Sequence, residues 1–150
     1  VTVSKDGKHV YVASAASDAV AALARNKTTG ALTQLGALEG CISQDGSGPC
    51  TDGKALIAAF SVSVSPDGKH VYVASSSSNA VAVFTRNKTT GVLTQLSDDN
   101  GCIAHGPSFG ACRVGKALLE PRSVAVSPDG KHVYVASSNS NAVAVFAREQ

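Results

Sequence analysis

Four cysteines are the residues of this 150-residue chain with the clearest capacity for covalent chemistry. Cys41 precedes Cys50 by nine positions and Cys102 precedes Cys112 by ten, at equivalent places in two similar segments. Each pair predicts a disulfide that closes its own surface loop, a constraint on the unfolded chain that contributes roughly 2–3 kcal/mol. A four-cysteine zinc site is the alternative, but its ligands usually lie only about two to four residues apart. We therefore expect Cys41–Cys50 and Cys102–Cys112 disulfides, no metal site, no cofactor, and an oxidising location that is extracellular, at the cell surface or periplasmic.

Histidines are the next candidates, because a ring of imidazoles could bind a metal or transfer protons. His9, His70 and His132 occupy one position of a repeated motif, each after a lysine and at the start of an expected strand. A partly solvated structural imidazole is the ordinary interpretation of that place. His105 lies outside the motif and has no visible acid or base partner. No catalytic residue is predicted.

Acidic side chains are clustered in glycine-rich segments, where oxygen ligands could bind Ca²⁺. Their spacing does not match a twelve-residue calcium loop. We interpret them as turn residues and hairpin residues, namely Asp45, Asp52, Asp98 and Asp99, and Asp6, Asp67 and Asp129.

Polar residues also recur where the third strand of each copy should end. Arg25, Arg86 and Arg148 hold this place, and we expect them to form a solvated rim with Lys27 and Lys88. Beyond the first two arginines, Asn-Lys-Thr triplets create formal N-glycosylation acceptors at Asn26 and Asn87, although asparagine also favours turns.

The motif that positions all these residues is a repeat. Residues 61–84 read SVSVSPDGKHVYVASSSSNAVAVF, and residues 123–146 differ from them only at Ser63/Ala125 and Ser77/Asn139. A more diverged copy occupies residues 1–23. Alternating small polar and β-branched residues predict strands with one buried face, and Pro-Asp-Gly predicts a tight turn.

Each copy therefore predicts a four-stranded antiparallel meander, repeated every 61–62 residues without helices. A small sheet cannot bury its apolar face alone, so neighbouring sheets must stack, as the blades of a β-propeller do. We expect an all-β partial propeller of about 2.75 blades, the alternatives being a β-solenoid or a linear array. The expected organisation is blade 1 (residues 1–39), a Cys-bearing connector (40–60), blade 2 (61–100), a second connector (101–122) and an incomplete blade 3 (123–150).

The blade pattern SPDGKHVYVAS, NAVAVF and TTGALTQL resembles that of the seven-bladed lactonase-like propellers and the related YVTN surface-protein repeats. The resemblance covers almost all of each blade but not the connectors. It implies a propeller, and lactone hydrolysis in some members, but no catalytic motif of the family matches a position here.

Near-identical copies place the same residue at symmetric positions, whereas a catalytic site needs different groups at one point. We therefore predict a non-catalytic structural or interaction scaffold. The alternatives are a multivalent binder of glycans or small ligands, disfavoured by the absence of Trp, and a lactonase-type hydrolase, supported by resemblance alone.

Apolar outer faces of the first and last blades predict self-association. Two copies, giving six blades, are the simplest closed assembly, and a filament is the outcome if the contact does not close. The alternative is that these 150 residues are part of a longer propeller. The net charge of +2 does not indicate nucleic-acid binding, and no run of about 18 apolar residues predicts a membrane span.

Overall fold

A computed structural model describes residues 1–46, 48–107 and 111–148 of the chain. The last two residues of the predicted third blade therefore lie outside the described part. In that part the chain forms three mostly antiparallel β-sheets and no α-helix. Its two short 3₁₀ helices are not long enough to cross a membrane. The all-β propeller-blade prediction is confirmed.

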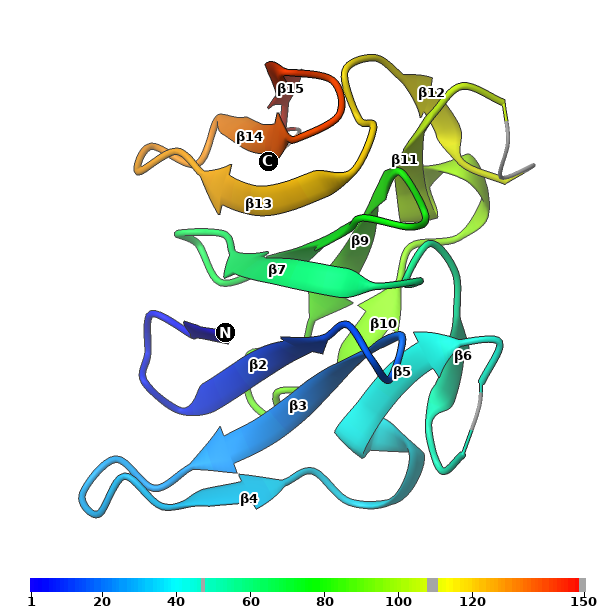
Figure 1. Ribbon diagram of the computed structural model, residues 1–150. Helices are drawn as coiled ribbons and strands as arrows, with labels where there is room; N and C mark the ends of the chain where they lie inside the picture. Colours follow the sequence, from blue (N-terminus) through cyan, green and yellow to red (C-terminus); the bar gives the residue numbers. More distant parts are fainter. Residues whose placement is uncertain (47, 108–110, 149–150) are drawn as a thin grey trace.

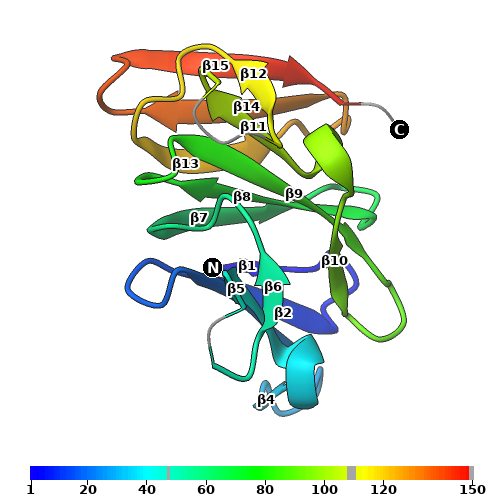
Figure 2. The same ribbon diagram turned by 90° about the vertical axis from the view of Figure 1, so that its right-hand side faces the viewer.

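The three sheets stack one on another in chain order, as Figure 1 shows from one side and Figure 2 from another. The first sheet contains β1 (Thr2–Val3), β2 (His9–Ser14), β3 (Ala19–Arg25), β4 (Leu32–Gln34), β5 (Cys41–Gln44) and β6 (Thr51–Gly53). The second contains β7 (Ala59–Val64), β8 (His70–Ser75), β9 (Ala80–Arg86), β10 (Leu93–Gln95), β11 (Cys102–His105) and β12 (Arg113–Gly115). The third contains β13 (Pro121–Val126), β14 (His132–Ser137) and β15 (Ala142–Ala147).

The fourth strand of each meander is divided into two parts. The C-terminal half of β9 pairs with β10, and its N-terminal half pairs with β11. The 3₁₀ helix η2 (Asp98–Gly101) joins these two partners, as η1 (Ala37–Gly40) joins β4 to β5 in the first sheet. The connectors, expected to be loops, thus extend the sheets, and β5–β6 and β11–β12 pair in parallel.

Both predicted disulfides are present in these connectors. Cys41 is bonded to Cys50, and Cys102 to Cys112. Each bridge ties the segment between two parallel strands at the outer edge of its sheet.

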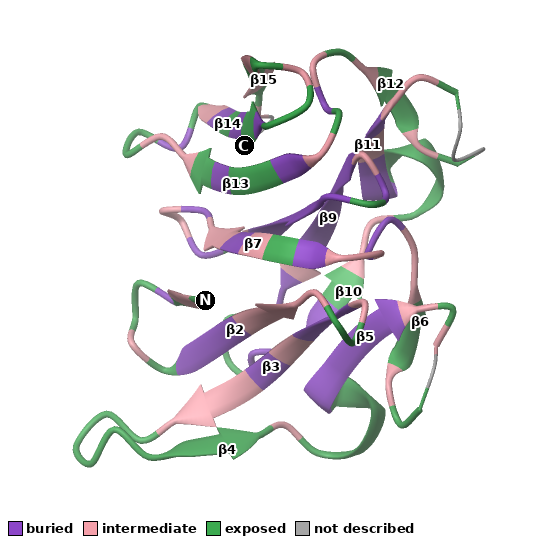
Figure 3. Ribbon diagram, viewed as in Figure 1, coloured by how far each residue is buried: buried purple, intermediate pink, exposed green. Residues whose placement is uncertain are grey.

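Two apolar layers lie between the sheets. In each layer, the side chains that alternate along the strands of one blade pack against those of the next blade. Between the first and second sheets, Tyr11 and Val20 pack with Val71, Val73 and Phe84. The layer between the second and third sheets has these members: Tyr72, Ala74, Val81, Val83, Leu118, Val124, Val133, Val135 and Ala144. The middle sheet is covered on both faces, so β9 is almost entirely buried, whereas β4 at one end of the stack is exposed (Figure 3).

Candidate functional site

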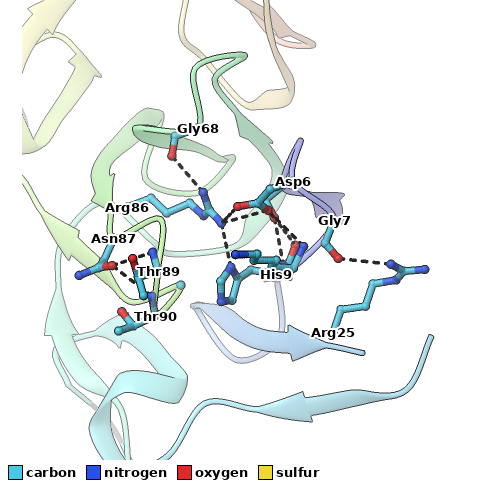
Figure 4. Close-up of polar contacts among 12 residues, drawn as sticks. Asp6, Gly7, His9, Arg25, Gly68, Arg86, Asn87, Thr89 and Thr90 are labelled. Atoms are coloured by element: carbon cyan, nitrogen blue, oxygen red, sulfur yellow. Dashed lines mark hydrogen bonds and ion pairs between the residues drawn. The ribbon is translucent and has the colours of Figure 1, made fainter. Parts of the chain in front are cut away.

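A buried cluster of polar side chains joins the first blade to the second (Figure 4). Arg86, at the end of β9, extends across the interface. Its Nε donates to Tyr11 Oη at 2.8 Å, and its Nη2 lies 2.8 Å from His9 Nδ1 and 3.2 Å from Asp6 Oδ2. Its Nη1 donates to the carbonyl oxygen of Gly68 in its own blade at 3.2 Å.

The same cluster recurs between the second and third blades. Arg148 Nε donates to Tyr72 Oη at 3.0 Å, and its Nη2 lies 2.6 Å from Asp67 Oδ2 and 2.8 Å from His70 Nδ1. Its Nη1 donates to Gly130 O at 3.0 Å. We call these two sets of residues the arginine clusters.

Electrostatics in the arginine clusters favour one protonation state of each member. Burial alone would raise the pKa of Asp6, but hydrogen bonds from Ser4, the Lys8 amide and Arg86 outweigh it and hold that pKa well below its usual range. Burial, followed by the charge of Arg86, lowers the pKa of His9. Because a guanidinium can only donate, His9 Nδ1 must accept, which requires the neutral imidazole.

The arginine clusters are therefore structural. The guanidinium donors of each buried arginine are directed at four partners, which leaves them poorly placed to bind a substrate. The expectation of a solvated arginine rim is wrong for Arg86 and Arg148, whose side chains are 1% and 2% exposed. Each crosses to the neighbouring blade, a contact between residues more than 70 positions apart that spacing within one repeat does not reveal.

Acid is expected to weaken blade stacking through the histidines of these clusters. The pKa of His9 and that of His70 are lower in the folded chain than the ordinary value of 6.5. The unfolded chain therefore binds more protons below pH 6.5, so the free energy of unfolding should fall progressively as the pH is lowered from 6.5, and Asp6 and Asp67 should extend the loss below about pH 4.

Urea unfolding at several pH values measures this effect. The double variant His9→Gln/His70→Gln should show a flatter dependence between pH 6.5 and 5, whereas His132→Gln, in dilute protein, should keep the slope because no arginine of the described chain contacts His132. An unchanged slope in the double variant would show that these imidazoles do not carry the pH dependence.

A second cluster of interacting side chains is solvent-exposed at the start of β13. Arg122 Nη2 is 3.2 Å from Glu120 Oε2, and Ser138 Oγ is also 3.2 Å from Glu120 Oε2. The Arg122 guanidinium lies 4.4 Å from the ring centroid of Phe60, which belongs to the neighbouring strand β7. Their side chains remain partly exposed, and we call Glu120, Arg122, Ser138 and Phe60 the β13 head group.

The backbone of Glu120 is held by hydrogen bonds from both the preceding blade and its own blade. Asn79 Oδ1 accepts from the Glu120 amide at 2.8 Å, and the Glu120 carbonyl oxygen accepts from the Ser138 amide at 3.0 Å. Glu120 has a φ of +50°, a conformation that a residue with a side chain adopts only when its surroundings fix it. The carboxylate is thus positioned by its fold neighbours on both sides.

An open hollow of about 540 Å³ adjoins the β13 head group. Arg122, Ser137, Ser138 and Asn141 line its polar part. Ser137 is buried, and its Oγ has no hydrogen-bond partner among the described residues, as is also true of the equivalent Ser75 in the second blade. The exposed ion pair, with Ser138 and Asn141, gives this hollow polar groups that can bind and orient a small polar molecule.

The second blade lacks this chemistry at the equivalent place. Ala58 and Phe60 stand where the third blade has Glu120 and Arg122. The near-identical copies begin immediately after these positions, at Ser61 and Ser123, so the repeat motif does not include them. The signal that could have found the site is the contrast between Ala-Ala-Phe and Glu-Pro-Arg where two otherwise matching repeats diverge.

The remaining candidates stay apart from the β13 head group. His105 lies at the end of β11 with a buried Nδ1 that has no hydrogen-bond partner in the described part of the chain. Among the described residues, the ion pair that Asp99 forms is a long, exposed one with Arg113, at 3.9 Å. Within residues 1–46, 48–107 and 111–148, no three His, Cys, Asp or Glu side chains come together as a metal site.

Asn26 and Asn87 lie in exposed turns, where the Oδ1 atom of each accepts hydrogen bonds from two following backbone amides. Glycosylation of these two residues remains a prediction.

A more enclosed cavity of about 210 Å³ lies between the second and third blades. His70, Tyr72, Leu96, Ile103 and Phe146 help to line it. Tyr72, Leu96, Ile103 and Phe146 also belong to the apolar layer between these two blades, so the cavity is part of the packing between them.

Known proteins similar to this chain are lactonase-like. A family model described as the seven-bladed β-propeller lactonase matches residues 60–106. A 6-phosphogluconolactonase of Formosa agariphila is 30% identical over 90 residues, which cover 59% of this chain and 21% of that protein.

Solved structures show the same fold. A putative 6-phosphogluconolactonase of Bacteroides fragilis matches with a TM-score of 0.73 at 22% identity, over 99% of this chain and 34% of that one. The periplasmic gluconolactonase of Pseudomonas aeruginosa matches with a TM-score of 0.71 at 27% identity, again over 99% and 34%. The chain thus spans about a third of these structures and about a fifth of the Formosa protein.

These similarities overturn the prediction of a non-catalytic scaffold, because the proteins they identify are named for lactone hydrolysis. The prediction was based on the copied residues alone, and the chain also contains residues without counterparts, among them Glu120 and Arg122 just outside the copied stretch. The resemblance that the blade motif indicated is confirmed: the repeats of this chain are consistent with the lactonase-like β-propeller family.

Proposed function

We propose that this chain carries a lactonase-type hydrolase activity toward sugar lactones, with its reacting groups in the β13 head group. The observation that supports the activity most directly is the match of residues 60–106, which include Phe60 and most of β7, to the lactonase propeller model. Glu120 and Arg122 lie outside that match, and their assignment depends on the geometry of the β13 head group. The pairing of an exposed carboxylate with a guanidinium beside an open hollow supplies the chemistry that opening a lactone needs.

The reaction follows from the two charges. The Glu120 carboxylate takes a proton from a water molecule as the water oxygen attacks the lactone carbonyl carbon. The negative charge that develops on the carbonyl oxygen is stabilised by the nearby guanidinium of Arg122. When the ring C–O bond breaks, the leaving oxygen takes the proton back from Glu120, which yields the open hydroxy acid and restores the carboxylate.

Polar side chains around the same hollow can orient a sugar. Ser138 and Asn141 are exposed and line this hollow beside Arg122. A hydroxyl of the substrate can hydrogen-bond to these side chains, and a site built to form such a bond discriminates against ligands that lack the hydroxyl. We therefore expect polyhydroxylated lactones to be better substrates than plain aliphatic ones.

The proposed location is extracellular or periplasmic. Two disulfides persist only where the environment is oxidising, and a similar structure is that of a periplasmic gluconolactonase. An oxidising compartment would keep the Cys41–Cys50 and Cys102–Cys112 bridges intact during turnover.

Acid release from gluconolactone and its 6-phospho derivative tests the activity. The purified, disulfide-intact chain should accelerate opening of at least one of them above the spontaneous rate in the same buffer, and chain unfolded in urea and then assayed should not. A spontaneous rate in the presence of chain whose circular dichroism shows the native β-sheet would refute the proposal.

A further inference from the structure

The residue that precedes the first strand of the second and third blades has a left-handed backbone. Ala58 precedes β7 with a φ of +54°, and Glu120 precedes β13 with a φ of +50°. A residue with a side chain keeps this conformation only where its neighbours hold it. Because two different residue types adopt it at equivalent places, the fold imposes the conformation whichever side chain is present.

One side chain of the preceding blade binds the backbone of each of these residues. The Ala58 amide donates to Asp18 Oδ1 at 2.7 Å, and the Glu120 amide donates to Asn79 Oδ1 at 2.8 Å. Asp18 lies in the turn between β2 and β3, and Asn79 in the turn between β8 and β9. Their own φ values are +49° and +50°, a conformation that Asp and Asn tolerate better than most residues. The contact is thus a repeated device of the interfaces between blades.

Asn79 is itself fixed by its own blade. Its amide donates to the Ser76 carbonyl oxygen at 3.2 Å, and its carbonyl oxygen accepts from the His105 amide of β11 at 2.8 Å. On the other side of Glu120, its carbonyl oxygen accepts from the Ser138 amide at 3.0 Å. Glu120 is therefore held between an anchored side chain of the second blade and the backbone of the third.

The conformation of Glu120 decides where its carboxylate lies. In the left-handed conformation the side chain reaches Arg122 Nη2 and Ser138 Oγ, both 3.2 Å from its Oε2. Without the acceptor on Asn79, the Glu120 amide loses its bond to the preceding blade, and the residue can relax to the negative φ that is ordinary for glutamate. The Cβ atom then points in another direction, and the carboxylate moves away from the Arg122 guanidinium.

We propose that Asn79 is a positioning residue for lactone opening, which acts by holding Glu120 in the conformation that places its carboxylate beside Arg122. Asn79 itself does not contact the reacting atoms. This inference rests on the proposed function, in which Glu120 is the general base, and it adds that a residue of the second blade is needed to complete the site on the third. Asp18 holds Ala58 in the same way, but the methyl side chain of Ala58 has no chemistry to position.

Gluconolactone opening by variants of Asn79 tests the positioning role. Asn79→Gly removes the carboxamide but keeps the turn unstrained, because glycine adopts a positive φ readily. The kcat of this variant should fall about ten- to a hundredfold, with KM changed less than about threefold, because a displaced base slows the reaction without removing substrate contacts. Asn79→Asp keeps the Oδ1 acceptor that Asp18 provides at the first interface, so it should restore kcat to within about threefold of the unaltered value. Asp18→Gly is the matched control, since it removes the equivalent bond to Ala58, and its kcat should be unchanged.

Hydrogen exchange of the Glu120 amide, followed by NMR, gives a readout that does not depend on activity. The amide should exchange at least about tenfold faster in Asn79→Gly and regain its protection in Asn79→Asp. Full kcat in Asn79→Gly beside an inactive Glu120→Gln would overturn the positioning role and leave the proposed hydrolase intact. Full kcat in both variants would overturn the assignment of Glu120 and this inference with it.

Discussion

Replacing Arg86 with alanine is expected to lower the free energy of unfolding by about 3–5 kcal/mol, the cost of removing one partner from a buried ion pair. The variant leaves Asp6, His9 Nδ1 and Tyr11 Oη without their shared donor inside the first interface. Domains of this size are stable by only about 5–15 kcal/mol, so the loss should be visible as a large shift of the urea midpoint.

Arg25→Ala is the matched control for this prediction. It removes the same side chain from the same position of the repeat, but in dilute protein that side chain has only the Gly7 carbonyl oxygen as partner among the described residues. Its effect should stay below about 1 kcal/mol. Because the chain has no Trp, circular dichroism of the sheets is the suitable signal. Equal losses in the two variants would mean that the cross-blade contacts do not stabilise the stack.

The other large effect concerns the β13 head group. Glu120→Gln keeps the shape of the side chain and its place beside Arg122 and Ser138 but removes the carboxylate that we propose accepts a proton from water. Loss of a general base lowers the turnover number by roughly 10²–10⁴-fold. The variant should therefore bind sugar lactones and open them close to the spontaneous rate.

Glu39→Gln serves as the control because Glu39 is also an exposed acid, in η1 and far along the chain from β13. Its activity should equal that of the unaltered chain. Full activity in Glu120→Gln, with native circular dichroism, would assign the reaction to other residues. Separate measurement of kcat and KM distinguishes a lost base from lost substrate binding.

Much of the fold could be predicted from the repeat because each strand is short, alternates strictly and ends at a strong turn signal. The segment His70–Ser75 has the same bounds as its counterparts His9–Ser14 and His132–Ser137, since identical residues face the same apolar layers. The strands in the connectors could not be predicted this way. Cys41–Gln44 forms a strand because it completes the pairing of β3 beyond β4, which is a property of the neighbouring strand.

The polar sites were harder to predict for the same reason. Arg86 looks like a surface residue within its own repeat and becomes buried only when the next sheet covers it. Glu120 and Arg122 precede a copied stretch and carry no motif, so their proximity to Ser138 and Phe60 depends on how β13 stacks beside β7. Contacts between blades are set by stacking, which a single repeat does not encode.

We propose that the chemistry of this chain arises where the repeats differ, at the start of β13. The measurement that tests it most directly is the rate of gluconolactone opening by the double variant Glu120→Ala/Arg122→Phe, which gives the third blade the residues Ala58 and Phe60 of the second. We predict a natively folded chain that opens the lactone no faster than buffer. Retention of the unaltered chain's rate by this variant would contradict the claim.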